Sequence, residues 1–451
     1  MEHFQKKYGF ARSDVGLHNW RECPYSQWAF ENVVELVPSS IIRACAPPAD
    51  ALKADNSDAF FSQMVRLSDR PETVSSFLQR SQTDHFLVSK AGKPILCWQG
   101  ACSKADRPHI VFSVSKSFTG ILAGLLQNSG ALDFQRPVSH YVPQALSGGY
   151  GDCALQHLLD MRANVDFSEE YLNEDGDYAR YRRATLWNPP LADRPNEALE
   201  DMLLSIAKGP GPHGGPFRYL SPNSDLLGIV LERCTGANYA QIMEELLWHP
   251  MGASSDALIT VDQKGTPRSA GGISVTARDL LKLGNLLLDH GAANGVQVIP
   301  EAWIHDMRHN GDEAAWNNGN FSTFLPGGRY RNKWYQLARP SLAFLAIGIH
   351  GQWLFVDPEA VQPLSDPHDP VCSRCDRSRE ALPKACHSDK NAWRPNNAQC
   401  RTVLDRVVCS TGAFGPRLHG SRKRSAAWQR SPLALITSEH GASCNLEMRV
   451  R

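Results

Sequence analysis

Residues 110–118 read IVFSVSKSF, a short apolar run that passes directly into a helix-like pattern. Downstream apolar residues recur with i, i+3, i+4, i+7, i+8 spacing at Phe118, Ile121, Leu122, Leu125 and Leu126. This spacing is typical of one apolar face of an α-helix. The sequence therefore predicts a buried helix that begins near Ser113.

The start of this helix carries an S-x-x-K motif, Ser113 to Lys116, whose two ends lie one turn apart on the same face. A serine hydroxyl needs a base, and lysine serves only if burial or nearby positive charge lowers its pKa. The positive end of the helix dipole supplies such a potential. The structural alternative is an N-cap Ser113 followed by a solvated Lys116.

A second S-x-x-K copy spans Ser205 to Lys208. It runs straight into Gly209-Pro210, where a helix cannot continue. We therefore predict that this copy is not a catalytic site.

Two later segments offer chemistry that would complement Ser113. Tyr219 lies in a turn, residues 217–223, that precedes a helix-like run, and a tyrosine beside a lysine can shuttle protons. Residues 347–352 place small residues on a predicted strand whose backbone N–H groups could stabilise an oxyanion. The alternatives are a core aromatic for Tyr219 and a polar strand end for His350.

Local patterns on both sides of residues 131–270 predict a sheet. Residues 86–88 and 95–98 are strand-like and flank a tight turn, which predicts a hairpin at a sheet edge. Strand character returns at residues 342–349 and 353–356, after a helix that we expect Thr276 to cap. The sheet is therefore predicted to form from both ends of the chain around an inserted, mainly helical region.

The 451 residues have zero formal net charge, with 42% hydrophobic and 21% charged residues. This composition is that of a globular protein, and it predicts neither a nucleic-acid nor a membrane partner. No apolar run suits a membrane span or a signal peptide, so we expect a cytoplasmic protein. The cysteines are expected to be reduced rather than paired in disulfides.

Taken together and in this order, these residues resemble the class C β-lactamase, DD-peptidase and carboxylesterase superfamily, over roughly residues 18–358. The likeness is strongest to the 6-aminohexanoate-dimer (nylon oligomer) hydrolases. It rests on Trp28-Ala29-Phe30, Phe112 to Ser117, Asp160-Met161, Tyr219 to Asn223, Gly271 to Asp279 and Gly348 to Gln352. The resemblance implies an α/β (α+β) fold, an antiparallel sheet flanked by helices with an inserted helical domain.

The resemblance also implies roles for particular residues. Ser113 is acylated, Lys116 is the base, and Tyr219 protonates the leaving group. The backbone N–H groups of Ser113 and Ile349 form the oxyanion hole. Substrate contacts are expected from Tyr171, which falls on the family's mobile loop, and from Asn223, His350 and Gly351. No metal or cofactor is implied, the partner is a small ester or amide, and a homodimer is compatible with the sequence.

Departures from the family pattern narrow the expected substrate. His350-Gly351-Gln352 stands where β-lactamases have K-T-G, so we expect no β-lactam hydrolysis. The strong amidases of this family have an acidic residue and an asparagine where this chain has Tyr181-Arg182-Arg183 and Ala270. We therefore expect a substrate with a cationic amine end to bind poorly. A short-chain ester is the expected substrate class. The alternative is a single-turnover sensor or a decayed gene product.

We expect an irregular N-terminal segment (1–80), a sheet domain (81–130 plus 271–358), a helical domain (131–270) and an anomalous tail (359–451). Residues 361–451 hold 15 Lys and Arg against 8 Asp and Glu, and no sustained period of 2 or 3.6. We interpret this tail as out-of-frame. The alternatives are a zinc module at Cys372, Cys375 and Cys386-His387, or a basic interaction tail. The resemblance implies a further strand after residue 358, beside the first N-terminal strand of the sheet, and an out-of-frame tail would lack it.

Overall fold

The computed structural model describes residues 2–47, 52, 57–65, 71–193 and 195–359, and the backbone of one further strand, Leu433–Ser438. The zinc ligands considered above, Cys372, Cys375, Cys386 and His387, lie outside these ranges. Within the described ranges, no helix is both long enough and apolar enough to cross a membrane.

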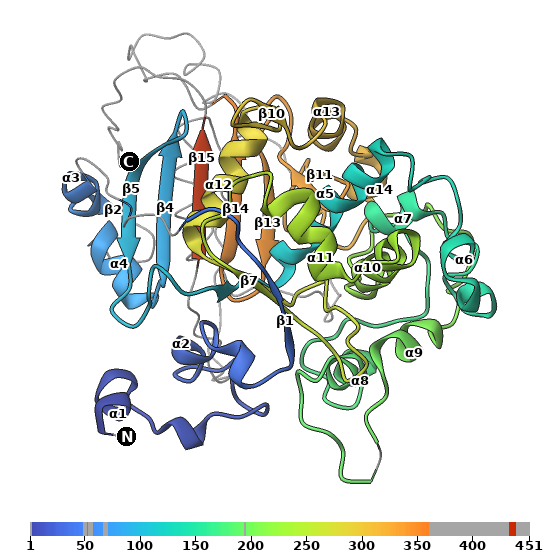
Figure 1. Ribbon diagram of the computed structural model, residues 1–451, viewed down its shortest axis with the longest axis horizontal. Coiled ribbons are helices and arrows are strands. Elements are labelled where there is room, and N and C mark those ends of the chain that lie inside the picture. Colours follow the sequence, from blue (N-terminus) through green and yellow to red (C-terminus); the bar gives the residue numbers. More distant parts are fainter. Residues whose placement is uncertain are drawn as a thin grey trace, which may run out of the picture.

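A mixed sheet forms the centre of the described structure, with the strand order β11-β12-β13-β14-β15-β4-β5 (Figure 1). Its strands are β4 (His85–Lys90), β5 (Lys93–Gln99), β11 (Arg329–Arg331), β12 (Trp334–Gln336), β13 (Phe344–Gly348), β14 (Gln352–Asp357) and β15 (Leu433–Ser438). The sheet therefore combines an N-terminal hairpin with strands that follow residue 328, as predicted from the sequence.

Strand β15 was not predicted, because no strand was recognised in the sequence after residue 358. It lies between β14 and β4 and runs parallel to both, with Leu435 opposite Leu354 and Leu87. The other pairings in this sheet are antiparallel. The place that we expected to be vacant beside β4 is thus occupied by a strand from the tail.

The predicted edge hairpin is confirmed, because β4 pairs antiparallel with β5 at the end of the sheet. Its turn places Ala91 at φ 49° and Gly92 at φ 74°. Two successive residues with positive φ match the twist that a two-residue hairpin turn needs. The glycine satisfies this requirement without a steric penalty.

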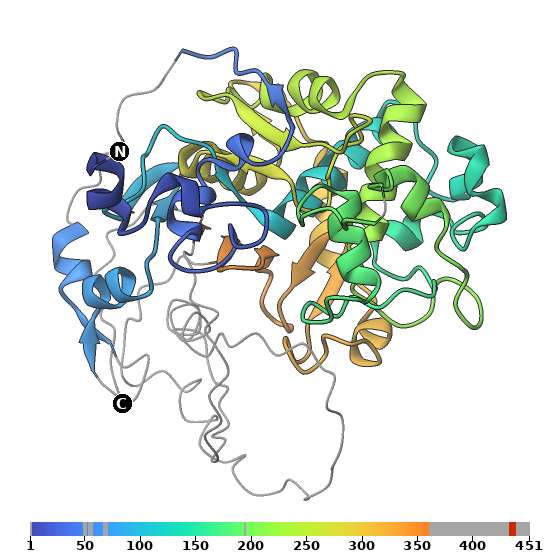
Figure 2. The same cartoon turned by 90° about the horizontal axis from the view of Figure 1, so that it is seen from below.

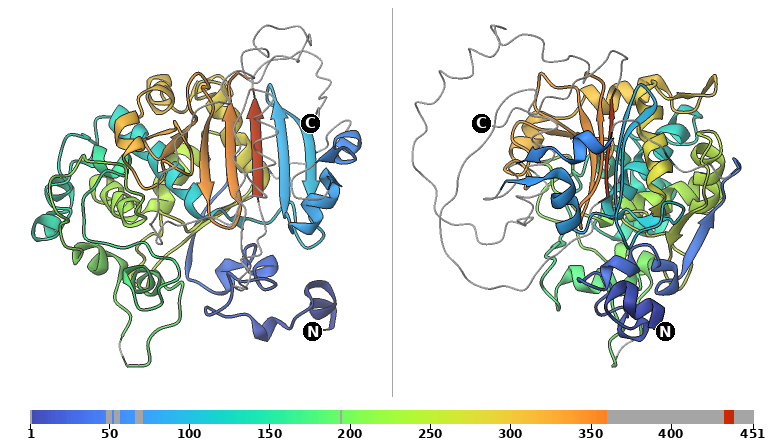
Figure 3. Two further views of the ribbon diagram at one scale, coloured as in Figure 1. Left: turned by 180° about the vertical axis from the view of Figure 1, so that it is seen from behind. Right: turned by 90° about the vertical axis from the view of Figure 1, so that its left-hand side faces the viewer.

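The two faces of the sheet bury different side chains. Phe86 and Val88 pack with residues of α3 (Ser57–Phe61) and α4 (Val74–Arg80), whereas Leu87 faces the opposite way, toward the leucines of α12 (Ala277–Leu288). This alternation is the period of two expected of a strand. Figure 3 shows α12 on one face and α3 and α4 on the other.

Helix α12 begins as predicted, because Thr276 Oγ1 accepts a hydrogen bond from Asp279 N at 3.1 Å. The buried helix that was predicted to begin near Ser113 is present as α5 (Ser115–Asn128). The remaining helices are α1 (Glu2–Tyr8), α2 (Ser26–Ala29), α6 (Val138–Tyr141), α7 (Leu155–Leu159), α8 (Asp177–Ala184), α9 (Leu199–Leu204), α10 (Pro222–Thr235), α11 (Tyr239–Met243), α13 (Glu301–His309) and α14 (Glu313–Asn317).

A smaller sheet, with the order β1-β7-β8-β6, joins the N-terminal segment to the core. Its strands are β1 (Ser39–Ile42), β6 (His109–Ile110), β7 (Ala257–Thr260) and β8 (Ile273–Val275). The short pairs β2 (Met64–Val65) with β3 (Glu72–Thr73) and β9 (Ala292–Ala293) with β10 (Val296–Gln297) complete the described strands. Strand β1 adds regular structure to a segment that we expected to be irregular, and Figure 2 shows how this segment runs along the molecule.

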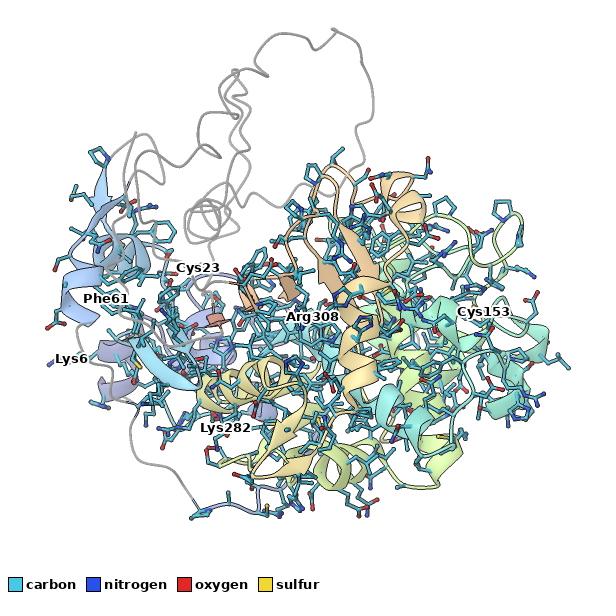
Figure 4. All side chains as sticks on the ribbon, turned by 90° about the horizontal axis from the view of Figure 1, so that it is seen from above. Lys6, Cys23, Phe61, Cys153, Lys282 and Arg308 are labelled. Atoms are coloured by element: carbon cyan, nitrogen blue, oxygen red, sulfur yellow. The ribbon has the colours of Figure 1, made fainter. Side chains whose placement is uncertain are left out.

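Helices α6 to α11 all lie within residues 131–270, the region predicted to be mainly helical, but turns and loops make up more than half of this region. The exact division of the chain into domains stays a prediction. The described cysteines are unpaired, and Figure 4 shows Cys23 and Cys153 in separate parts of the molecule.

Candidate active site

The segment that presents Ser113 has an unusual backbone. Phe112 has φ 46°, in the left-handed region that a bulky residue rarely adopts, and a 3-10 turn (Phe112–Val114) then leads into α5. The Phe112 ring is held by an aromatic cluster that consists of Trp20, Phe30, Trp187 and His350, with ring centroids 4.8 to 6.2 Å away. Such a conformation persists only where the surroundings enforce it, and this packing does so.

Ser113, Lys116 and Tyr219 converge as the sequence predicted. Lys116 Nζ lies 2.8 Å from Ser113 Oγ and 5.0 Å from the centroid of the Tyr219 ring. The Tyr219 hydroxyl shares a hydrogen bond with Ser113. The Lys116 and Tyr219 side chains are buried and Ser113 is half-buried, so Ser113 is the most accessible of the three.

Burial lowers the pKa of Lys116 to about 7, and the Arg268 guanidinium contributes to the decrease, whereas Glu169 and Asp225 oppose it. A substantial fraction of the amine is therefore uncharged at neutral pH and able to accept a proton. Lys116 Nζ also lies 2.7 Å from the Ala270 carbonyl, which can only accept a hydrogen bond. This carbonyl takes one N–H and leaves the amine lone pair available to Ser113.

A buried ion pair holds the Ala270 peptide in place. Asp225 accepts a hydrogen bond from Ala270 N at 2.6 Å and forms a salt bridge with Arg268, which also contacts the Tyr181 hydroxyl. Both charged side chains of the pair are almost fully excluded from solvent. An isolated buried charge is unfavourable, so Asp225 and Arg268 must stay paired, and their hydrogen bonds fix the position of the Ala270 peptide. Sequence reasoning did not identify this pair.

Tyr219 is suited to donate a proton. Burial raises its pKa well above the ordinary value, and the charge of Glu169 raises it further. The phenol therefore keeps its proton at neutral pH. Its ring stacks on Phe321 with centroids 4.9 Å apart, and its backbone N–H donates to Asn320 Oδ1 at 3.1 Å.

Glu169 is a further residue that the sequence analysis passed over. Its carboxylate accepts hydrogen bonds from the Tyr171 hydroxyl at 2.8 Å and from Ser221 Oγ at 2.7 Å. It also accepts from Ser221 N at the start of α10, where the free N–H groups of a helix favour an anion. Glu169 therefore ties the loop that carries Tyr171 to the turn that carries Tyr219.

The segment that was predicted to form the oxyanion hole approaches Ser113. A Cβ atom added to Gly348 would lie 2.5 Å from Val111 O and 3.2 Å from Ser113 N. Only glycine permits this approach, which brings the peptide that links Gly348 to Ile349 beside the Ser113 backbone. The oxyanion role of the Ser113 and Ile349 N–H groups is compatible with this geometry and stays a prediction.

The four residues that were predicted to contact the substrate have the following environments. Asn223 is fully buried, accepts from the Tyr150 hydroxyl at 2.9 Å and has its amide nitrogen 3.6 Å from Met161 Sδ. The His350 ring is buried in the aromatic cluster around Phe112, and Gly351 belongs to the turn after β13. Tyr171 is half-buried and its ring packs on Tyr178 at 4.4 Å.

The second S-x-x-K copy does not form a comparable pair. Ser205 follows the last residue of α9 and donates to Met202 O, while the exposed Lys208 side chain forms a salt bridge with Asp152.

Another lysine, Lys333, is buried near Lys116, and burial lowers its pKa well below the ordinary value. Its Nζ donates to Leu158 O at 2.5 Å. Among the described residues, no cluster of His, Cys, Asp and Glu side chains is arranged to bind a metal.

Comparisons with known proteins identify the family of this chain. The Beta-lactamase family model matches residues 74–368. The 6-aminohexanoate-dimer hydrolase of Paenarthrobacter ureafaciens is 32% identical over 350 residues, which cover 78% of this chain and 87% of that protein. A beta-lactamase of Providencia stuartii is 26% identical over 175 residues, 37% of this chain and 39% of that protein.

Among solved structures, a Bacillus anthracis protein whose name also refers to 6-aminohexanoate-dimer hydrolase matches with a TM-score of 0.70 and 22% identity. The match covers 78% of this chain and 90% of that chain and shows a common fold. The family model spans more than half of the residues, and the Paenarthrobacter relative is similar along most of its length. The chain therefore belongs to the Beta-lactamase family.

Proposed function

We propose that this protein is a serine hydrolase that cleaves a carboxylic ester or a small linear amide through an acyl-enzyme intermediate. The observation that carries the proposal is the contact between Ser113 Oγ and the buried Lys116 amine, whose pKa of about 7 suits a general base. Membership in a family that includes 6-aminohexanoate-dimer hydrolase supports an acyl-transfer reaction.

In the acylation step, Lys116 accepts the Ser113 hydroxyl proton while Oγ forms a bond to the substrate carbonyl carbon. The backbone N–H groups of Ser113 and Ile349 hold the negative charge that develops on the carbonyl oxygen. Tyr219 gives its phenolic proton to the leaving oxygen or nitrogen as the scissile bond breaks. The proton on Lys116 then returns to Tyr219.

Water hydrolyses the acyl-enzyme by the same route in reverse. Tyr219 passes its phenolic proton to Lys116 as it takes a proton from the water, whose oxygen forms a bond to the acyl carbon. Lys116 then gives its proton to Ser113 Oγ as the bond between Oγ and the acyl carbon breaks and the carboxylic acid leaves. We favour esters over β-lactams, since His350-Gly351-Gln352 stands where β-lactamases have K-T-G and therefore lacks the lysine that would hold a β-lactam carboxylate. The assignment to an ester rather than an amide rests on Arg182 and Ala270, as argued from the sequence.

The test is hydrolysis of p-nitrophenyl acetate and p-nitrophenyl butyrate by the wild type, Ser113→Ala and Ser205→Ala. We expect Ser113→Ala to lose roughly three orders of magnitude in kcat, because a nucleophile in a catalytic unit cannot be replaced. Ser205→Ala is the matched control, since it alters the other S-x-x-K copy and should keep the wild-type rate. Equal rates for Ser113→Ala and wild type would refute the nucleophile assignment.

The same assay separates the hydrolase from a sensor. A sensor would release one equivalent of p-nitrophenol in a burst and then stop, whereas a hydrolase continues after the burst. Intact-mass measurement of the protein after mixing would then show whether an acyl group stays on Ser113.

A further inference from the structure

Two arginine side chains beside the site lack a carboxylate partner. Arg21 donates to the Trp187 carbonyl at 2.8 Å and to Asn188 Oδ1 at 2.6 Å. Arg182, on α8, donates to the Tyr171 carbonyl at 2.5 Å. These acceptors are all neutral, and among the described residues neither guanidinium forms a salt bridge. Positive charge in a partly buried site is unfavourable unless an anion accompanies it.

The two guanidinium groups act on each other. Both residues contact the segment 187–188. The main-chain carbonyl of Arg182 accepts from Trp187 N at 2.8 Å, and the Arg21 guanidinium donates to Trp187 O and Asn188 Oδ1. Burial, and after it the charge of Arg182, lowers the pKa of Arg21 to about 9. Arg21 is still charged at neutral pH, so the two positive charges repel each other.

The nearby carboxylates are already engaged. Asp225 pairs with Arg268, and Glu169 binds Ser221 and Tyr171. The Nε atoms of Arg182 and Arg268 are buried and have no hydrogen-bond acceptor within the described part of the chain. Three guanidinium groups, those of Arg21, Arg182 and Arg268, thus stand against two buried or half-buried carboxylates on this side of the site. The carboxylate of Glu22, which also acts on Arg21, is exposed to solvent and so offsets the positive charge only weakly.

This positive side adjoins the nucleophile. The Arg182 guanidinium carbon lies 4.4 Å above the Tyr178 ring, which in turn packs on Tyr171. A Cβ atom added to Gly271 would lie 3.2 Å from the Trp187 ring, and 3.9 Å from both Arg268 Nη2 and the Phe112 carbonyl carbon. Of the three guanidinium groups, that of Arg268 therefore lies near Phe112, the residue that precedes Ser113.

We propose that the substrate carries a carboxylate at the end that lies against Arg182, and that Arg182 determines this specificity. Arg21 and Arg268 supply additional positive potential. A guanidinium binds a carboxylate through two parallel N–H groups, which a neutral or cationic end cannot match. This inference rests on the proposed ester hydrolysis at Ser113.

The test compares matched substrates that differ only in their end group. On the acyl side these are p-nitrophenyl esters of adipic, hexanoic and 6-aminohexanoic acids, which end in an anion, a methyl group and a cation. On the leaving-group side they are 4-acetoxybenzoate and its methyl ester. Each kcat/KM is divided by the rate constant for hydroxide-catalysed hydrolysis of the same ester, which removes differences in intrinsic reactivity.

We expect the anionic member of at least one series to be preferred by about tenfold or more, the usual size of a charge-assisted hydrogen bond. The 6-aminohexanoyl ester should be the poorest substrate in its series. In Arg182→Gln the preference should fall to near unity, whereas Arg182→Lys should keep part of it. The ratio is measured within one protein sample, so a loss of folded material cancels.

Arg183→Gln is the matched control, since Arg183 lies next to Arg182 on α8 and its guanidinium is exposed, with a 3.4 Å contact to Glu174 O. It should keep the wild-type preference. A second measurement needs no variant: adipate should inhibit wild-type hydrolysis of p-nitrophenyl hexanoate competitively and more strongly than adipamide does.

The outcomes separate the two levels of inference. If no ester is turned over, the proposed hydrolysis itself fails. If neutral esters are turned over but neither series favours the anion, the carboxylate specificity is wrong while the hydrolase stands. If the preference persists unchanged in Arg182→Gln, Arg182 serves only to anchor neighbouring segments, and the proposal is overturned.

Discussion

Lys116 can act as a base only while its amine is uncharged. Since its pKa is about 7, the fraction of enzyme with a neutral amine rises as pH increases through this value. We therefore expect kcat/KM for p-nitrophenyl acetate to increase with pH and to level off above about 8. Glu169 opposes the lowering of this pKa, so Glu169→Gln should shift the acidic limb of the profile to lower pH.

Glu170→Gln is the control for that shift, because Glu170 is the exposed neighbour of Glu169. An acidic limb that stays in place in Glu169→Gln, or that moves to higher pH, would contradict the electrostatic role assigned to Glu169. The profile should be measured between pH 5 and 9 with Ser113→Ala as the background.

The sequence predicts the proximity of Ser113, Lys116 and Tyr219 better than it predicts the residues packed around them. Ser113 and Lys116 are one helical turn apart, so a local motif is enough to place them together. Glu169, Asp225 and Arg268 come together only through long-range packing, and no local pattern marks a carboxylate for such a role. Asn223 was expected to contact substrate, but its position in the first turn of α10 points its amide toward Tyr150 and Met161.

At the level of elements, the aromatic cluster around Phe112 stabilises the turn that presents the nucleophile. Trp20 is fully buried, stacks on Phe112 and donates from its indole N–H to Trp187 O at 3.1 Å. We expect Trp20→Ala to lower the free energy of unfolding by about 3 to 5 kcal/mol, as for other buried aromatic residues. It should also reduce kcat, because Phe112 loses a contact that holds its positive φ.

Urea denaturation and p-nitrophenyl acetate turnover measure the two effects. Val34→Ala in the same segment is the control, since Val34 is half exposed and its loss should change stability by less than about 0.5 kcal/mol. A Trp20→Ala protein with wild-type stability would show that the cluster does not hold this turn.

The elements that were predicted correctly carry strong local signals. The hairpin of β4 and β5 has turn chemistry between two apolar runs, and α12 has its Thr276 cap. Strand β1 is four residues long and pairs with β7, more than two hundred positions later. Strands this short have no distinct periodicity, so only their distant partners define them.

For the molecule as a whole, β15 completes the sheet between β14 and β4. An interior strand donates and accepts hydrogen bonds on both sides, and proline cannot donate. Leu435→Pro should therefore lower the free energy of unfolding by about 1 to 3 kcal/mol, through an unpaired backbone group. Leu433→Pro, at the first residue of the strand, should have a smaller effect.

Thermal unfolding and soluble yield of both variants test this prediction. Identical midpoints for Leu435→Pro and wild type would show that this strand does not contribute to the stability of the sheet. The segment was overlooked in the sequence because its four apolar residues stand alone in a tail of mixed composition. The parallel pairing that gives them a place depends on two strands that are remote in the chain.

The contact between Lys116 and the Ala270 carbonyl has a consequence for how such a protein diversifies. A main-chain oxygen is present whatever side chain stands at its position, so no substitution at residue 270 deletes the anchor of the base. Mutational drift and laboratory evolution can therefore vary this position to explore new substrates while the base keeps its hydrogen bond. Substitution of Asp225 would instead disturb the base, because the Asp225 side chain holds the Ala270 peptide in place.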